Sequence, residues 1–215
     1  MNFKLKLAGA TFAAIVAFGG AVSAATLSYV GTGQTHVVTQ NNLGIGLNGT
    51  SVDFISGDMK TASNGLSLSG PANIRYTYLG YEAANTNYAA SIGSGTLFTN
   101  GVSSIGSFAS TTQAAAGLLD FSFGTSSPLS RIGQFFNNGG ANPADSKYAI
   151  GYKMISSTAF YVLFDDIAGG DRDFDDIAMR VDVSAVPLPA AAFPLLTALA
   201  GLGFVGRRRR QRKNA

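Results

Sequence analysis

The chain has 215 residues, 46% of them apolar and 13% charged, with no cysteine, no tryptophan and one histidine. This composition is typical of a single modest globular domain, and it excludes disulfide frameworks, cysteine nucleophiles, thiolate metal centres and multi-histidine metal sites. The formal net charge of +3 arises at the ends of the chain, because residues 25–185 carry seven Lys and Arg and all 12 Asp and Glu. We therefore expect no nucleic-acid binding by this acidic central segment.

The first 24 residues have the pattern of a secretory signal peptide. Two lysines lie within the first six residues, residues 7–22 are uncharged and mostly apolar, and small side chains precede Ala24. The apolar stretch is about 16 residues long, which is shorter than the roughly 20 that a membrane-spanning helix needs. We predict an N-terminal signal helix that is removed by cleavage after Ala24, with cleavage after Ala25 as the alternative.

Residues 25–185 are predicted to form one domain, in which short β-type segments alternate with glycine-rich turns. Four Asn-Gly pairs favour tight hairpin turns, and they begin at Asn48, Asn64, Asn100 and Asn138. Runs typical of strands lie at residues 26–30, 36–39, 52–55, 74–81, 117–123, 148–155, 158–164 and 177–183. The best candidate for a short helical turn is at residues 129–136. Many short strands at close spacing predict an all-β fold, an antiparallel β-sandwich or jelly-roll-like domain.

Three weaker signals within this domain have both a functional and a structural interpretation. His36 has no obvious acid or serine partner in the sequence, and we interpret it as an edge-strand histidine. Tyrosine offers sugars a flat apolar face, although aromatic residues are also favoured in strands for packing alone. The tyrosines concerned are Tyr76, Tyr78, Tyr81 and Tyr88. A glycan-acting enzyme would need two carboxylates about 5 to 9 Å apart across a cleft, and it would have to recruit Glu82 or Asp120.

Residues 165–176 hold six of the 12 carboxylates of the chain. Two carboxylates about 7 Å apart repel by roughly 0.6 kcal/mol in water, and more strongly inside a protein. Arg172 offsets part of this repulsion, and a hard divalent cation held by oxygen ligands would offset more, with Ca²⁺ the best match. The candidate ligands are Asp165, Asp166, Asp171, Asp173, Asp175 and Asp176. The alternative is a solvated turn in which Arg172 pairs locally and the aspartates cap backbone amides.

Residues 186–215 have the pattern of a membrane anchor that follows a proline motif. The motif consists of Val186, Pro187, Leu188, Pro189 and Ala190. The uncharged residues 186–206, at 1.5 Å per residue in a helix, reach about 30 Å, which is one hydrocarbon thickness. The arginine-rich residues 207–213 are expected on the cytoplasmic side. We predict a C-terminal transmembrane helix at residues 190–206, with the domain outside the membrane.

The proline motif, the short apolar helix and the terminal arginine cluster together resemble the PEP-CTERM sorting signal in its VPLPA variant. This resemblance implies processing by an exosortase, an integral-membrane cysteine protease or transpeptidase of Gram-negative bacteria that make exopolysaccharide. Cleavage would occur near the proline motif, so the C-terminal helix would be a transient membrane anchor. The chain has Val-Pro-Leu-Pro where the founding pattern has Pro-Glu-Pro.

The acidic segment carries a second resemblance. Its sequence F-D-D-x-x-x-G-D-R-D-F-D-D-I, which begins at Phe164, is similar to the F-E-D-x-x-x-G-D-x-D-Y-N-D motif of an uncharacterised bacterial extracellular β-domain. PEP-CTERM proteins often carry that domain. The resemblance implies that metal is bound through the six aspartates of residues 165–176.

Together these features predict a secreted, non-catalytic protein of the cell surface or exopolysaccharide (biofilm) matrix, with a structural calcium loop at residues 165–176. The predicted partners are an exosortase-type processing enzyme, the membrane through the transient helix, and exopolysaccharide. A carbohydrate-binding module is the alternative function, and a glycan-acting enzyme is the less favoured third.

Overall fold

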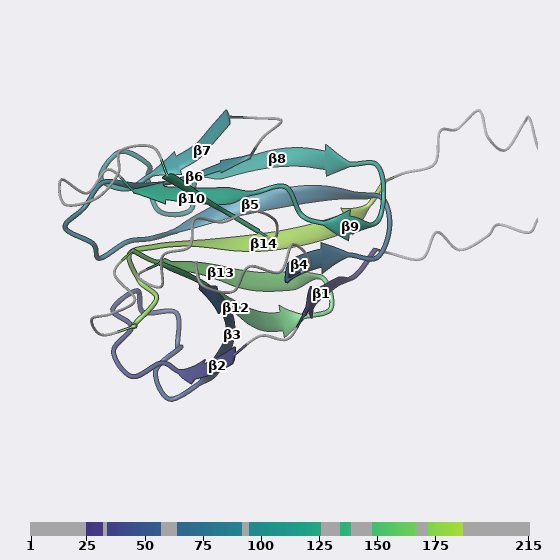
Figure 1. Ribbon diagram of the computed structural model, residues 1–215. Coiled ribbons are helices and arrows are strands. Elements are labelled where there is room, and N and C mark those ends of the chain that lie inside the picture. The colour runs from purple at the N-terminus through teal and green to yellow at the C-terminus, as the bar shows by residue number, and fades with distance from the viewer. Residues whose placement is uncertain are drawn as a thin grey trace, which may run out of the picture.

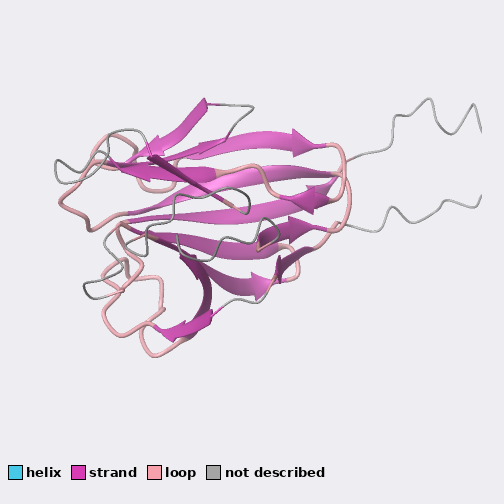
Figure 2. Cartoon of the chain, in the orientation of Figure 1, coloured by secondary structure: helices cyan, strands magenta, loops and turns pink. Residues whose placement is uncertain are grey.

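The computed structural model describes residues 25–31, 34–56, 64–91, 95–125, 134–138, 148–166 and 172–186. Within these ranges the chain forms 14 strands and no helix (Figure 2), and every strand pairing is antiparallel. The prediction of an all-β antiparallel fold is therefore confirmed. No helix in the described ranges is long and apolar enough to cross a membrane. The predicted signal helix, motif residues 187–190 and the predicted transmembrane helix lie outside those ranges.

A seven-stranded sheet forms the largest layer of the molecule (Figure 1). Its strands, in spatial order, are β2 (Gln34–Val37), β3 (Ser51–Ser56), β12 (Ala149–Ser156), β13 (Ala159–Asp165), β14 (Ile177–Ala185), β5 (Ala72–Gly80) and β8 (Phe108–Gln113). Strands β13 and β14 pair in the register Phe164 to Ile177. The chain therefore leaves β13 and returns into β14 at the same end of the sheet, and the acidic segment connects the two strands there.

Two smaller sheets pack against one face of this sheet. One has the order β1 (Leu27–Val30), β4 (Gly65–Leu68) and β9 (Gly117–Leu118), and the other has the order β11 (Gln134–Asn137), β10 (Ser122–Thr125), β6 (Asn87–Ser91) and β7 (Gly95–Thr99). All three sheets contribute to one hydrophobic core, which includes Leu66 of β4, Phe123 of β10 and Phe164 of β13. The rings of Phe123 and Phe164 stack with their centroids 5.1 Å apart.

The period-two pattern of residues 177–183 is confirmed by strand β14. Ile177, Met179 and Val181 are fully buried in the hydrophobic core that the three sheets share, called the main core below. Arg180 and Asp182 alternate with them and form an ion pair, with 2.7 Å between Nη2 and Oδ1. The other predicted strands, apart from the one at residues 117–123, match observed strands to within two residues at each end.

Strands β4, β6, β7 and β8 were not predicted, and two predicted segments differ from the structure. Residues 117–123 form two strands rather than one, because pairing with β4 ends at Leu118 and pairing with β6 begins at Ser122. The helical turn predicted at residues 129–136 is wrong for residues 134–136, which belong to β11 and pair with β10. Short helices are marginal without tertiary support, and the neighbouring strand supplies the backbone partners instead. Residues 129–133 lie outside the described ranges.

Two of the four Asn-Gly pairs form turns, of which the one at Asn48 lies between the paired strands β2 and β3, whereas the one at Asn100 connects β7 to β8 in different sheets and makes no hairpin. At Asn48-Gly49 and Asn100-Gly101 the glycines have φ values of 77° and 70°, which glycine adopts without strain. Gly65, by contrast, is the first residue of β4, and the buried Asn64 before it packs against Gly31. The fourth pair begins at Asn138, and its glycine lies outside the described ranges.

Asn138 is a buried bridge between the sheets. Its Nδ2 donates to the carbonyl oxygens of Leu66 and Leu119, each at 2.8 Å. Its Oδ1 accepts from the backbone N–H of Leu66 at 2.7 Å and from the hydroxyl of Tyr152 at 2.9 Å. One amide side chain therefore satisfies polar groups from β4, from β12 and from the connection between β9 and β10.

We expect Asn138→Ala to lower the free energy of unfolding by about 3 kcal/mol or more, because it leaves several buried polar groups without partners at about 1–3 kcal/mol each. Urea denaturation of the purified protein measures the loss. Asn42→Ala is the matched control, since the side chain of Asn42 is exposed. Equal losses in the two variants would contradict the bridging role of Asn138.

A second, smaller hydrophobic cluster lies on the opposite face of the seven-stranded sheet. It consists of Val38, Leu47, Val52, Phe54, Ala149, Leu163, Phe174 and Ala178. Its strand residues alternate with those of the main core, as Leu163 does with Phe164. Val38 and Leu47 come from the loop between β2 and β3, and Phe174 comes from the acidic segment. Both segments are therefore packed against this face.

Candidate metal centre

The aspartates of the acidic segment are mostly buried. Asp165, Asp166, Asp173 and Asp175 are between 0% and 7% exposed. This burial differs from the solvated turn that the sequence left open as an alternative. Buried carboxylates require hydrogen bonds, positive charge or protonation, because removing a lone charge from water is costly. The segment therefore concentrates negative charge in a place where water does not solvate it.

Phe174 holds the segment in this position. Its side chain is fully buried in the second cluster, with its ring 5.9 Å from that of Phe54 and 6.0 Å from that of His36. Phe174 and Arg172 both have left-handed backbone conformations, with φ of 59° and 52°. Such conformations cost about 1–3 kcal/mol each outside glycine, so packing of the ring must hold the backbone in place. Arg172 lies over the ring of Phe54, with its guanidinium carbon 4.8 Å from the centroid.

Asp175 is the most constrained of these acids. It is 0% exposed, its Oδ2 accepts a hydrogen bond from the backbone N–H of Asn42 at 2.7 Å, and its carbonyl oxygen accepts from the N–H of Glu82 at 2.8 Å. Its Oδ1 is buried and has no hydrogen-bond partner among the described residues. A buried carboxylate oxygen without a donor costs free energy, and a cation would remove that cost.

Glu82, Asp173 and Asp175 form the one acidic group in the described ranges whose geometry suits a metal ion. One carboxylate oxygen from each lies within 4.8 Å of the others. Oxygen ligands at 2.3–2.6 Å from a single Ca²⁺ are at most about 5 Å apart, so this spacing fits. Glu82 is exposed, whereas the two aspartates are buried.

Glu82 is the member of this group that sequence analysis did not assign to the metal. It follows β5, which pairs with β14 in the register Gly80 to Ala178. That antiparallel register places the residues just after Gly80 beside those just before Ile177. Glu82 could therefore be assigned to this group only from the pairing of β5 with β14, which no local sequence motif indicates.

Asp166 and Asp176 have a different environment. The carboxylate of Asp166 accepts from Nδ2 of Asn85 at 3.1 and 3.3 Å and from Nδ2 of Asn87 at 2.7 Å. The backbone N–H of Asp166 donates to Oδ2 of Asp176 at 2.6 Å. Side-chain amides and a backbone amide thus stabilise these two acids. Asp171 lies outside the described ranges, so the complete set of six aspartate ligands stays a prediction.

The pKa of Asp176 is raised, chiefly by burial. Burial raises the pKa of its carboxyl from 3.8 to about 8, the hydrogen bond from Asp166 opposes this rise, and the charges of nearby aspartates, Asp166 first, add to it. The unfolded chain releases this proton near pH 4, whereas the folded chain holds it until about pH 8. The folded state is therefore favoured at low pH, and this contribution is lost as the pH rises from about 4 to about 8.

We expect the metal-free protein, kept in chelator, to become less stable between pH 5 and pH 8. Asp176→Asn cannot ionise, so its stability should depend less on pH in that range. Denaturant midpoints of the two proteins across the range give the comparison. Identical pH dependence in parent and variant would show that Asp176 does not hold the proton.

His36, Tyr76 and Tyr78, which the sequence offered as functional candidates, are packed against other side chains of the domain. His36 lies in the edge strand β2 and contacts Phe174, and burial followed by the charge of Arg172 lowers its pKa. Tyr76 and Tyr78 are 0% and 1% exposed and belong to the main core. These two tyrosines therefore fit the structural interpretation, packing within strands, because their side chains lie in the core that the small sheets cover.

No protein-family model, no curated protein and no solved structure matches this chain. The resemblances of the acidic motif and of the C-terminal segment therefore stay predictions. A function for the chain rests on its own residues and their arrangement.

Proposed function

We propose that this chain is an exported, non-catalytic protein of the bacterial cell surface or exopolysaccharide matrix, built as a β-sandwich that a calcium ion stabilises. The common core of the three sheets supports the sandwich, with the two smaller sheets forming its second layer. The observation that carries the proposal is the group of Glu82, Asp173 and the buried Asp175, whose Oδ1 has no hydrogen-bond partner in the described part of the chain. The role of the ion is structural.

Calcium fits this group better than other common metals. The donors are carboxylate oxygens, which hard cations prefer, and the group contains neither histidine nor cysteine. Calcium accepts six to eight oxygens in irregular arrangements, including backbone carbonyls, whereas Mg²⁺ requires a near-ideal octahedron. An ion bound here would link Glu82, after β5, to the segment that leads into β14. It would also offset the repulsion among the neighbouring aspartates.

We expect Ca²⁺ to raise the thermal midpoint of the purified protein relative to the same protein in chelator. A site that binds only the folded state adds about 2.7 kcal/mol when free calcium is a hundredfold above the dissociation constant. Asp175→Asn and Glu82→Gln should each remove most of this gain, because each deletes a ligand charge. Calorimetry or circular dichroism measures the midpoints.

Asp182→Asn is the matched control for these variants, because Asp182 is an acid of β14 that pairs with Arg180 away from the group. It should keep the calcium response of the parent. Equal midpoints with calcium and with chelator, or an unchanged response in Asp175→Asn and Glu82→Gln, would contradict the calcium site.

The export route is supported by the two ends of the sequence. The N-terminal pattern favours secretion, and the proline motif with its apolar segment and arginine tail favours a transient anchor. The alternative functions have less support. Tyr76 and Tyr78 are in the core, which removes the tyrosine surface of a carbohydrate-binding module. A glycan-acting enzyme would have to recruit Glu82 or Asp120, and Glu82 belongs to the acidic group with Asp173 and Asp175.

We expect the mature protein, expressed in an exopolysaccharide-producing Gram-negative host, to lack residues 1–24 and the segment after the proline motif. Fractionation followed by intact-mass spectrometry checks both ends. Replacement of Pro187 and Pro189 by alanine should leave the C-terminal segment attached. Pro71→Ala, in the domain, is the control, and it should be cleaved like the parent. Recovery of the parent from the cytosol with both ends intact would contradict export.

A further inference from the structure

Strand β8 forms one edge of the seven-stranded sheet (Figure 1), and β2 forms the opposite edge. On its inner side β8 pairs with β5, and no described strand pairs with its outer side. A strand at a sheet edge presents a row of backbone N–H and C=O groups with which another strand can pair. The outer side of β8 is therefore a template for strand addition.

The pairing of β8 with β5 determines which backbone groups face outward. The N–H of Tyr78 donates to the carbonyl oxygen of Ser107 at 2.9 Å, so this pair is a hydrogen-bonded position. Bonded and non-bonded positions alternate along an antiparallel pair, so every second residue after this position directs its N–H and C=O away from β5. These residues are Phe108, Ser110 and Thr112.

Strand β8 lacks the features that usually protect a sheet edge. Charged side chains, prolines and bulges are common protections. Residues 108–113 contain no charged residue and no proline, and their register with β5 has no shift. Phe108 is 60% exposed, and the connection that leads into β8 exposes Val102 and Ile105 as well. The edge thus combines outward backbone groups with exposed apolar surface.

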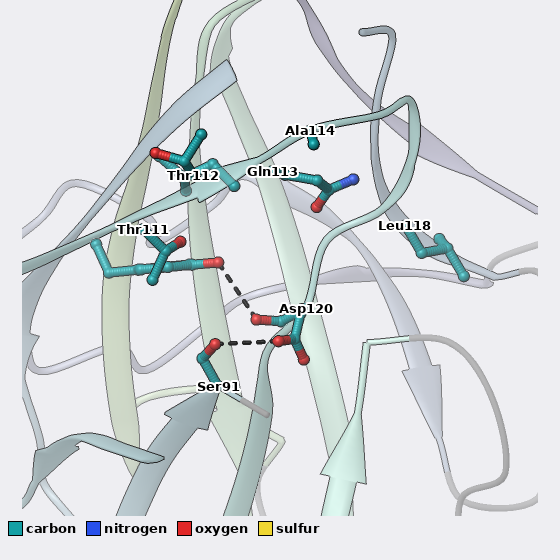
Figure 3. A pocket seen from close by; sticks show the side chains of 9 residues that line it. Ser91, Thr111, Thr112, Gln113, Ala114, Leu118 and Asp120 are labelled. Carbon is teal, nitrogen blue, oxygen red and sulfur yellow. Dashed lines mark hydrogen bonds between the residues drawn. The ribbon is translucent and has the colours of Figure 1, made fainter. Parts of the chain in front are cut away.

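Contacts on both faces hold β8 in an extended conformation. Thr111 and Thr112 lie on opposite sides of the strand (Figure 3). The side chain of Thr111 hydrogen-bonds to Tyr76 of the main core. On the other face, the guanidinium carbon of Arg75 lies 4.0 Å from the centroid of the Phe108 ring. The edge is therefore ordered before a partner strand is added.

The sequence of β8 is complementary to itself. In an antiparallel pair of two β8 strands with Ser110 opposite Ser110 of the second copy, Phe108 lies opposite Thr112 of the second copy. All of these residues direct their backbone groups outward, so each pair can exchange two N–H···O bonds. An aromatic side chain opposite a β-branched one is a favourable cross-strand pair, and no like charges meet. We propose that two copies of this chain form a symmetric dimer through β8, which joins their seven-stranded sheets into one continuous sheet.

The charge near the edge is compatible with this dimer. Arg75 is the one charged residue of β5 and β8, and it lies opposite Ser110 in the register. The two copies of Arg75 would be three strand spacings apart, about 14 Å. This distance exceeds the Debye length of about 8 Å at physiological ionic strength, so their repulsion is largely screened. The dimer depends neither on the export route nor on the calcium site.

Sedimentation velocity of the full-length protein, from about 1 μM to about 1 mM, tests the proposal. We expect a monomer–dimer equilibrium with a micromolar or weaker dissociation constant, because one edge strand buries less than a standard interface. Ser110→Pro should raise that constant about tenfold or more, since it removes the N–H groups of the central pair. The pairing of β8 with β5 does not use this N–H, and edge strands tolerate proline at such positions.

Thr35→Pro is the matched control, in the opposite edge strand β2. The N–H of Val38 donates to the carbonyl oxygen of Thr50, so by the same alternation the N–H of Thr35 faces away from β3. This variant should dimerise like the parent. Equal weakening by Thr35→Pro and Ser110→Pro, or assemblies that grow beyond a dimer with concentration, would place the contact elsewhere and overturn the proposal.

Ser110→Cys gives a second readout that does not depend on proline, because the chain has no cysteine of its own. Bonded residues of an antiparallel pair have Cα atoms about 5.5 Å apart, within the range of a disulfide. Mild oxidation should link Ser110→Cys into dimers and leave Ser157→Cys, at an exposed turn position, mostly unlinked. The proposal is also overturned if the parent is monomeric throughout, if Ser110→Pro associates like the parent, or if the two cysteine variants link equally.

Discussion

Burial of the Phe174 ring is the interaction on which the acidic segment depends. Truncating a buried phenylalanine typically costs about 3–5 kcal/mol, which exceeds the cost of either left-handed residue in the segment. The ring lies in the cluster formed by Phe54, Leu163 and their neighbours, so the residues on each side of it are drawn out of water. Asp173 and Asp175 are buried because Phe174 is buried. The grouping of the carboxylates is thus a product of apolar packing, which must offset the cost of burying their charge.

Buried asparagines fix several connections between strands through hydrogen bonds. The chain has no cysteine, yet its connections are fixed by side-chain amides that imitate strand partners. Asn41 donates to the carbonyl oxygens of Asp173 and Phe174, and Asn100 bonds to the backbone of both Asn85 and Asn87. Each amide offers two donors and an acceptor, so one side chain closes a loop where a strand ends. The same residue type therefore stabilises both the core, through Asn138, and the acidic segment, through Asn41.

Local pattern was sufficient for the strands with strong apolar alternation, of which β14 is the clearest. It failed for β8, whose sequence of small and hydroxyl residues has no apolar period, and for β11, whose strand state depends on pairing with β10. The high density of aspartates at residues 165–176 was sufficient to identify the acidic segment from the sequence. Glu82 and the burial of Tyr76 depend on which strands become neighbours and which face is covered, and these are properties of the whole chain.

Gly151 of β12 packs closely against the ring of Phe174, although β12 supplies no carboxylate to the acidic group. A Cβ atom at this position would lie 2.8 Å from Cδ1 of the ring, so even a methyl group would displace it. Displacement would be transmitted along the backbone to the acids on either side, while the pairing of β12 with β13 would be untouched. A substitution at Gly151 would in this way change the affinity for the proposed cation, with every proposed carboxylate ligand left in place.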